Sequence, residues 1–119
     1  LKPGSLLIIV PALNEEASVG FVVAEIKQTI PDVPVLVLDD SSTDTTAAVA
    51  RAAGAEVMTM PTHLGLGGMV QAGYRLAFEL GYEYVIRLDG DGQHDPKYIP
   101  VIFETLRNSG CQMVIGSRF

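Results

Sequence analysis

The chain has 119 residues, of which 48% are hydrophobic and 18% charged, so it suits one compact domain and is too apolar for wholesale disorder. Its formal net charge of −6 argues against a nucleic-acid-binding protein, because such binding rests mainly on Lys and Arg side chains that neutralise phosphates. The single cysteine, Cys111, excludes an intramolecular disulfide and is compatible with a reducing, cytoplasmic compartment. No apolar run reaches the roughly 18 residues that a membrane helix needs. The missing initiator Met and the ending directly after an apolar run indicate a single domain, residues 1–119, truncated from a longer protein.

Apolar runs alternate with segments of helical periodicity along the whole chain. The apolar runs predict five strands, over residues 5–10, 33–38, 55–60, 84–88 and 113–115. The segments between them predict four helices, over about 14–30, 44–53, 70–80 and 96–108. Strands that alternate with helices of this length are typical of the α/β class. We therefore expect a Rossmann-like, doubly wound, mostly parallel sheet with helices on both faces.

Local signals indicate where these helices begin. Asn14 is expected to cap the first helix, with the two glutamates that follow it in the first helical turn. The Ser- and Thr-rich stretch 41–44 offers capping groups for the second helix, and Gly54 is expected to end it. Residues 61–68, PTHLGLGG, predict a glycine-rich loop before the third helix, and Pro96 is expected in the first turn of the fourth.

Polar side chains follow three of the predicted strands. Asn14 and Glu15 come after the first strand, Asp39 and Asp40 after the second, and the stretch 89–91, Asp-Gly-Asp, after the fourth. Ligands of open parallel sheets bind beyond the carboxyl ends of the strands, at the point where the strand order reverses. A strand order of 3-2-1-4-5 would bring all three loops to one crevice.

A crevice rich in carboxylates needs a positive partner, because unpaired buried charges are costly. Mg²⁺ and Mn²⁺ take oxygen ligands, and Mg²⁺ is usually held by one or two carboxylates together with substrate phosphates. Asp89 and Asp91 could direct their oxygens to one side, and Gly90 would let the backbone approach a ligand closely. The alternative is an ordinary turn, since Asp and Gly are common turn residues.

Five stretches in this order resemble family 2 glycosyltransferases with the GT-A fold, and most closely the polyprenyl- or dolichyl-phosphate sugar transferases. They are IIVPALNEE (8–16), VLDDSSTDTT (37–46), HLGLGGMVQAGY (63–74), LDGDGQHDP (88–96) and VIGSRF (114–119). The resemblance covers nearly the whole chain. It implies that the chain is the N-terminal, nucleotide-sugar-binding part of such an enzyme, without the acceptor half.

The resemblance also implies roles for particular residues. Those that would bind the donor nucleotide are Pro11, Leu13, Glu15, Leu38, Asp40, Asp89 and Gly90. Asp89 and Asp91 would be the Asp-x-Asp pair that binds the metal, together with Gln93. Arg118 would act with these two aspartates in catalysis, because a guanidinium pairs its fork with phosphate oxygens.

The function implied by the resemblance is that of a metal-dependent hexosyltransferase domain, with Mg²⁺ or Mn²⁺ as cofactor and a GDP- or UDP-sugar as donor. In the full protein the sugar would pass to an acceptor, expected to be a polyprenyl or dolichyl phosphate. The site would be cytoplasmic, with downstream segments attaching the protein to the cytoplasmic face of the membrane. The isolated chain is expected to turn over little or no substrate.

Two other functions stay open. A sugar-phosphate nucleotidyltransferase also uses carboxylates and metal on a similar sheet. It would be expected to carry a basic, glycine-rich loop near the first strand, where this chain reads PALNEE without Lys or Arg. A non-catalytic nucleotide-binding module is the other alternative, disfavoured by the intact Asn14, Asp40, Asp89 and Asp91.

Overall fold

Five parallel strands form one sheet at the centre of the molecule. The computed structural model describes residues 6–88, 99–109 and 113–115. The strands of the sheet are β1 (Leu6–Ala12), β2 (Val35–Asp39), β3 (Glu56–Thr59), β4 (Tyr84–Arg87) and β5 (Met113–Ile115). Their order is β3-β2-β1-β4-β5, and every neighbouring pair is parallel. The predicted fold class and strand order are therefore confirmed.

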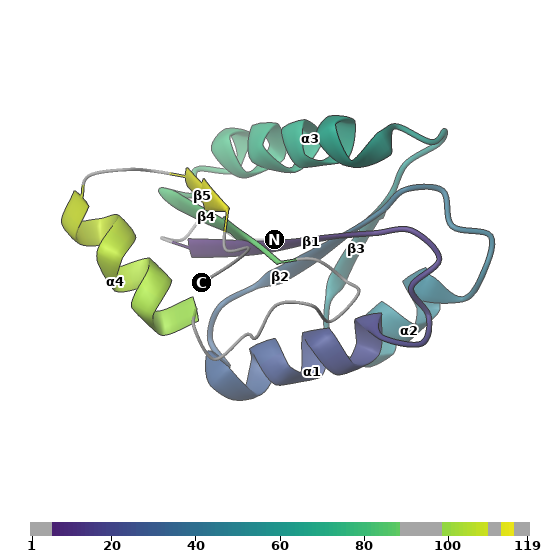
Figure 1. Ribbon diagram of the computed structural model, residues 1–119, viewed down its shortest axis with the longest axis horizontal. Helices are drawn as coiled ribbons and strands as arrows, with labels where there is room; N and C mark the ends of the chain where they lie inside the picture. Colours follow the sequence, from purple (N-terminus) through teal and green to yellow (C-terminus); the bar gives the residue numbers. More distant parts are fainter. Residues whose placement is uncertain (1–5, 89–98, 110–112, 116–119) are drawn as a thin grey trace.

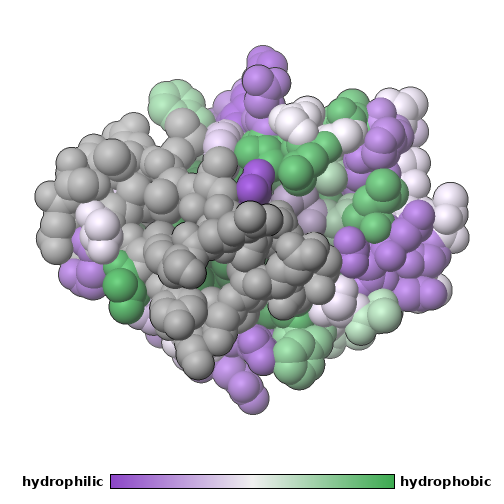
Figure 2. Space-filling model, viewed as in Figure 1, coloured by the Kyte–Doolittle hydropathy of each residue, from purple (hydrophilic) through white to green (hydrophobic). Residues whose placement is uncertain are grey.

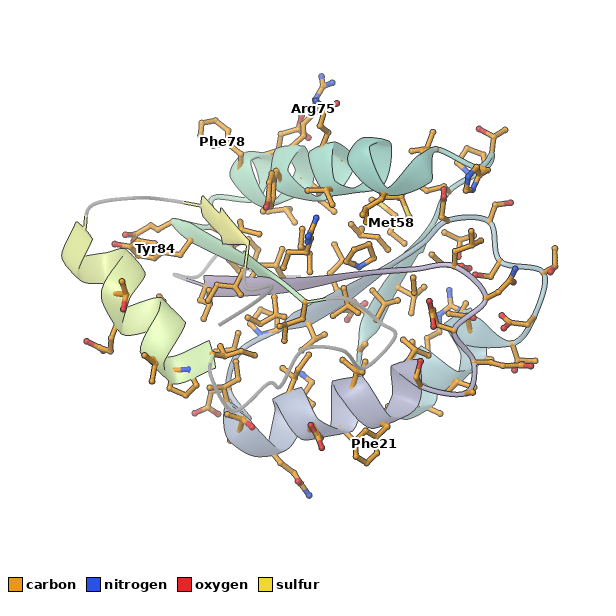
Figure 3. The ribbon with its side chains drawn as sticks, in the orientation of Figure 1. Phe21, Met58, Arg75, Phe78 and Tyr84 are labelled. Carbon is orange, nitrogen blue, oxygen red and sulfur yellow. The ribbon has the colours of Figure 1, made fainter. Side chains whose placement is uncertain are left out.

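Helices cover both faces of this sheet (Figure 1). They are α1 (Val19–Thr29), α2 (Thr46–Ala52), α3 (Gly65–Glu79) and α4 (Ile99–Ser109). Helix α3 lies on one face, and α1 and α2 lie on the other. Helix α4 packs beside β4, which carries Tyr84 (Figure 3). The rings of Tyr84 and Phe103 meet edge to face with centroids 5.5 Å apart.

Strand β1 explains why the first apolar run is continuous rather than alternating. Its side chains point in turn to the two faces: Ile8 joins the core under α1, and Ile9 joins the core under α3, each fully buried. A parallel strand with helices on both faces needs apolar residues at every position. The strand also pairs on both edges, with β2 and with β4, the latter from Leu6 opposite Tyr84 to Ile9 opposite Arg87.

The first helix begins at Val19, so the prediction that Asn14 caps it was wrong. Asn14 has a left-handed backbone (φ 52°), and its side chain bonds to the next loop instead. A separate turn follows it, in which the backbone N–H groups of Ser18 and Val19 donate to the carbonyl of Glu15. The two glutamates accordingly precede the helix, whose first turn holds no acidic residue.

The third helix begins at Gly65, inside the stretch 61–68 that was predicted to be a loop. Glycine costs about 1 kcal/mol relative to alanine within a helix. The carboxylate of Asp40, at the end of β2, accepts the N–H groups of Leu64 (2.7 Å) and Gly65 (3.0 Å) and so stabilises this first turn. The fourth helix begins at Ile99, and Pro96 lies outside the described residues.

The second helix agrees with its predicted ends. It runs from Thr46 to Ala52, and Gly54 follows it with a positive φ of 107°, a conformation that favours glycine. Within the described part of the chain, no helix is long and apolar enough to cross a membrane.

Candidate functional site

Two of the three loops that were predicted to converge do meet, at the carboxyl ends of β1 and β2 (Figure 1, right). The loop after β1 covers residues 13–18, and the loop after β2 covers residues 40–45. Polar side chains gather on this side of the molecule (Figure 2, purple, right). The third loop, with the Asp-x-Asp pair, lies outside the described residues, as do all of these predicted site residues: Asp89, Gly90, Asp91, Gln93 and Arg118.

The remaining predicted donor-binding residues differ in exposure. Pro11 and Leu38 are paired neighbours in β1 and β2, and both are buried. Leu38 belongs to the core under α3, so the alternation of side chains places Pro11 and Asp40 on that same face. Leu13 is 39% exposed and Glu15 is half-buried in the loop after β1. Three residues of the predicted set therefore lie on the α3 face, and the other two lie in the loop after β1, where the N–H of Glu15 bonds to Thr46 of α2.

The two loops are bound together by a reciprocal set of hydrogen bonds, which we call the two-loop clasp. It consists of Asn14, Glu15 and Glu16 on one side and residues 42–46 on the other. The N–H of Asn14 donates to Oγ of Ser42 (2.9 Å), and Oδ1 of Asn14 accepts the N–H of Thr43 (2.9 Å).

The glutamates continue the clasp towards α2. The N–H of Glu15 donates to the hydroxyl of Thr46 (2.9 Å), while Glu16 Oε2 accepts both the N–H (3.0 Å) and the hydroxyl of Thr45. The Thr46 side chain is fully buried, and its hydroxyl donates in turn to Asp44 Oδ1. The buried Thr46 hydroxyl thus acts as acceptor and donor at once, and both of its hydrogen-bonding roles are filled.

Asp44 fixes the start of α2 in the way that the sequence suggested. Its Oδ1 accepts the N–H of Thr46 (2.9 Å), and its Oδ2 accepts the N–H of Glu16 (3.3 Å). The pKa of Asp44 lies below its usual value, mainly because of the hydrogen bond from the Thr46 hydroxyl; burial opposes the shift, and the backbone N–H bonds add to it. The folded chain therefore favours the ionised carboxylate.

This shift predicts a pH-dependent effect of Asp44→Asn. A carboxylate with a lowered folded pKa stabilises the fold above its unfolded pKa, and the stabilisation is lost as the pH falls through the folded pKa. We expect the substitution to lower the free energy of unfolding at pH 7 and to have progressively less effect below about pH 4. Urea unfolding of both proteins at a series of pH values measures this difference. A difference that is the same at every pH would show that the charge of Asp44 does not contribute.

Asp40 is the most enclosed carboxylate of the site, with 1% of its surface exposed. Besides the two N–H groups at the start of α3, its Oδ2 lies 2.6 Å from Nδ1 of His63, whose side chain is 62% exposed. Its own N–H donates to the carbonyl of Ala12 (2.9 Å), which ties the end of β2 to β1. Asp40 therefore connects three segments: the end of β1, the loop before α3 and the first turn of α3.

The contacts of His63, Ser42, Thr43 and Thr46 were not expected from the sequence. Their long-range partners lie 23 to 31 positions away in the sequence, so no local pattern indicates the contact. The signal that could have indicated the Asp40 contact is indirect: a carboxylate is stabilised at the N-terminal end of a helix, because the helix dipole is positive there.

The described part of the site is acidic. The loop residues 13–18 and 40–45 contain four carboxylates (Glu15, Glu16, Asp40 and Asp44) and no Lys or Arg. Among the described residues, no group of three or more His, Cys, Asp and Glu side chains is arranged to hold a metal ion. The predicted ligands Asp89, Asp91 and Gln93 are not among those residues, so their assignment stays a prediction.

Comparisons with known proteins show the family of the chain. The model of the family described as "Glycosyl transferase family 2" matches residues 7–119. An undecaprenyl-phosphate mannosyltransferase from Micrococcus luteus is 36% identical over 118 residues, which cover 95% of this chain and 48% of that protein. A polyprenol monophosphomannose synthase from Mycolicibacterium smegmatis is 30% identical over 119 residues, covering 95% of this chain and 44% of that protein. The chain thus spans about half the length of these relatives.

The fold is also similar to solved structures. Glucosyl-3-phosphoglycerate synthase from Mycobacterium tuberculosis, in complex with Mn²⁺, UDP and glucosyl-3-phosphoglycerate, matches with a TM-score of 0.70 and 28% sequence identity. The match covers 86% of this chain and 39% of that one. The family match alone includes almost every residue of the sequence, and the resemblance stated from its motifs is confirmed. The chain belongs to glycosyl transferase family 2.

Proposed function

We propose that the chain is the donor-binding part of a metal-dependent glycosyltransferase and holds a nucleoside-diphosphate sugar at the carboxyl ends of β1, β2 and β4. The observation that carries this proposal is the two-loop clasp, which joins the loops after β1 and β2 next to the reversal of the strand order. Loops held together at this edge form a fixed wall against which a ligand can bind.

The base end of the donor would lie on the α3 side of this wall. Pro11, Leu13, Glu15, Leu38 and Asp40 are the residues proposed for it. The strand alternation, which places Pro11, Leu38 and Asp40 on one face, supports this set. Leu13 is the most exposed of the five and offers apolar surface to a ligand.

The phosphate end needs a cation, because the described loops supply four carboxylates and no Lys or Arg. Asp89, Asp91 and Gln93 would hold Mg²⁺ or Mn²⁺, since all three side chains offer the oxygen ligands that these ions prefer. A divalent ion at this position supplies charge neutralisation for the diphosphate leaving group. The guanidinium of Arg118 would pair with phosphate oxygens. The Mn²⁺ and UDP named in the complex of the similar synthase support this assignment.

For the whole protein, we propose transfer of the sugar to a polyprenyl phosphate at the cytoplasmic face of a membrane. The names of the two relatives, an undecaprenyl-phosphate mannosyltransferase and a polyprenol monophosphomannose synthase, support a lipid-phosphate acceptor. Such an acceptor is already an anion and can attack the anomeric carbon directly, so we assign no catalytic base to the chain.

Calorimetric titration with UDP, GDP and their sugars tests the proposal. We expect binding in the presence of Mn²⁺ and a loss of at least about tenfold in affinity when a chelator removes the ion, because the acidic site otherwise repels the diphosphate. Asp91→Ala should cause a similar loss in the presence of Mn²⁺. Asp32→Ala, the same change at an exposed position before β2, serves as the control and should bind normally. Equal binding with and without the chelator would refute the metal bridge.

A further inference from the structure

Asn14 combines a left-handed backbone with a side chain that reaches the neighbouring loop. Its φ is 52°, a region that non-glycine residues seldom adopt and that Asn tolerates better than most. Its N–H donates to Ser42 Oγ at 2.9 Å, and its Oδ1 accepts two bonds from Thr43, from the N–H at 2.9 Å and from the hydroxyl at 3.3 Å. Asn14 therefore contributes in two ways: its backbone adopts the left-handed conformation, and its side-chain oxygen binds the neighbouring loop.

The loop after β2 also contains a non-glycine residue with a left-handed backbone. Ser41 also has a positive φ, 63°, and the N–H of the next residue, Ser42, donates to Asp39 Oδ1 at 3.1 Å. Ser41 and Asn14 are the only non-glycine residues with positive φ among the described residues. Uncommon backbone conformations of this kind persist where the surrounding structure enforces them, and they gather at ligand sites.

The positions of these two residues connect them to the donor. Asn14 directly follows Leu13, and Ser41 directly follows Asp40, which are two of the residues proposed for the base end. The positive φ of Asn14 and of Ser41 sets the direction of the chain after Leu13 and after Asp40. The side-chain amide oxygen of Asn14 then joins the two loops through its bonds to Thr43. In addition, the N–H of Asp40 bonds to the carbonyl of Ala12. Segments held together before a ligand binds need less ordering on binding, which favours tight and selective binding.

We propose that Asn14 is a positioning residue that sets the base preference of the donor site without contacting the reacting atoms. The inference rests on the proposed function and adds to it one residue and its role. The hydrogen bonds of Asn14 go to Ser42 and Thr43 in the next loop. Contacts with the base of the donor are assigned to Leu13 and Asp40 instead. Losing the amide should therefore affect the contacts with the base and leave those with the diphosphate unchanged.

Glycine is the informative substitution, because it keeps the positive φ and removes only the side-chain bonds to Thr43. Ala17→Gly is the matched control: it adds a glycine to the same loop at an exposed position. Ser42→Ala is a second variant that removes the acceptor for the Asn14 N–H from the opposite side of the clasp.

The experiment measures the dissociation constants of UDP and GDP with Mn²⁺ for the unmodified protein and the three variants, with the melting temperature of each. The unmodified protein should prefer one nucleotide. Asn14→Gly should reduce that preference about tenfold, the worth of one or two hydrogen bonds, by weakening the preferred nucleotide alone. Ser42→Ala should shift the preference in the same direction, and Ala17→Gly should leave it unchanged.

Several results would overturn the inference. Unchanged preference in Asn14→Gly would remove the positioning role, and an equal weakening of both nucleotides would reduce Asn14 to a general structural residue. If the unmodified protein binds UDP and GDP equally, the site has no base preference, and Asn14 cannot set one. If the unmodified protein binds neither nucleotide, the proposed function itself fails, which separates that outcome from the others.

Discussion

Asp40→Asn should lower the free energy of unfolding by about 3 kcal/mol, since hydrogen bonds to a buried charged group are worth about 1.5–3 kcal/mol and an orphaned buried donor adds a further cost. The carboxylate accepts the N–H groups of Leu64 and Gly65 with one oxygen each. An amide has one oxygen, so its NH₂ group would face a backbone N–H at the start of α3. The interaction of the negative charge with the N-terminal end of the helix dipole is lost as well.

Urea unfolding, followed by circular dichroism, measures this loss. His63→Ala is the matched control, because it removes the third partner of the same carboxylate at an exposed position. It should cost less than Asp40→Asn, because the His63 side chain is 62% exposed and its removal leaves both backbone N–H groups bonded to the carboxylate. If Asp40→Asn were as mild as His63→Ala, the carboxylate would not be what stabilises the glycine-rich first turn of α3.

Gly73→Leu should cost about 3 kcal/mol or more, because the side chain would enter a core that is already full. A Cβ placed on Gly73 would lie 2.7 Å from Cδ1 of Leu38 and 3.0 Å from Cδ1 of Ile9. Both of these side chains are fully buried, so neither has open space to move into. Helix α3 would have to move away from the sheet, and the edge of the proposed donor site would move with it.

Gly67→Leu supplies the control for this prediction. Gly67 lies in the same helix, and a Cβ there would meet no atom within 4 Å. Glycine costs roughly 1 kcal/mol relative to alanine in a helix, whereas leucine is nearly as good a helix former as alanine. The Gly67→Leu variant should therefore be as stable as the unmodified protein or slightly more stable. Thermal unfolding of the two variants tests the contrast, and equal melting temperatures would contradict the packing that we describe.

The fold could be predicted from the sequence because its main signals are local. Continuous apolar runs such as the one containing Ile8 and Ile9 indicate strands buried on both faces, and their alternation with helical segments leads to a parallel sheet. The order β3-β2-β1-β4-β5 followed from asking which arrangement would gather the polar strand ends. The same reasoning correctly put Asn14, Glu15 and Asp40 after β1 and β2, whereas Asp39, which was also expected after the strand, is the last residue of β2.

The starts of two helices could not be predicted, because distant residues decide them. Asn is a residue type that is favoured at helix N-caps, yet the side-chain oxygen of Asn14 bonds to Thr43, 29 positions further on. Gly65 lies in a stretch that reads as a loop, yet Asp40, 25 positions before it, caps it as a helix start. Capping propensity is a local average, and a strong tertiary hydrogen bond overrides it.

The candidate site was predictable in outline only. The meeting of the loops after β1 and β2 is confirmed, whereas the metal ligands Asp89, Asp91 and Gln93 and the phosphate contact of Arg118 stay predictions. Asp40 was expected to face a ligand. The structure shows its two oxygens in contact with α3 and His63, so a base that bonds to this carboxylate would share it with those partners.

The pairing of β1 with β4 has a consequence for how the chain folds. Leu6 pairs with Tyr84, 78 positions later in the sequence, whereas β1 and β2 are joined through one helix. During synthesis from the N-terminus, β1, β2 and β3 can therefore assemble while the other edge of β1 is still unpaired. That edge is apolar, and an unpaired apolar edge invites pairing with another chain. Once residues 84–87 have left the ribosome, β4 can pair with this edge of β1. We expect protection from aggregation to begin at that point of translation.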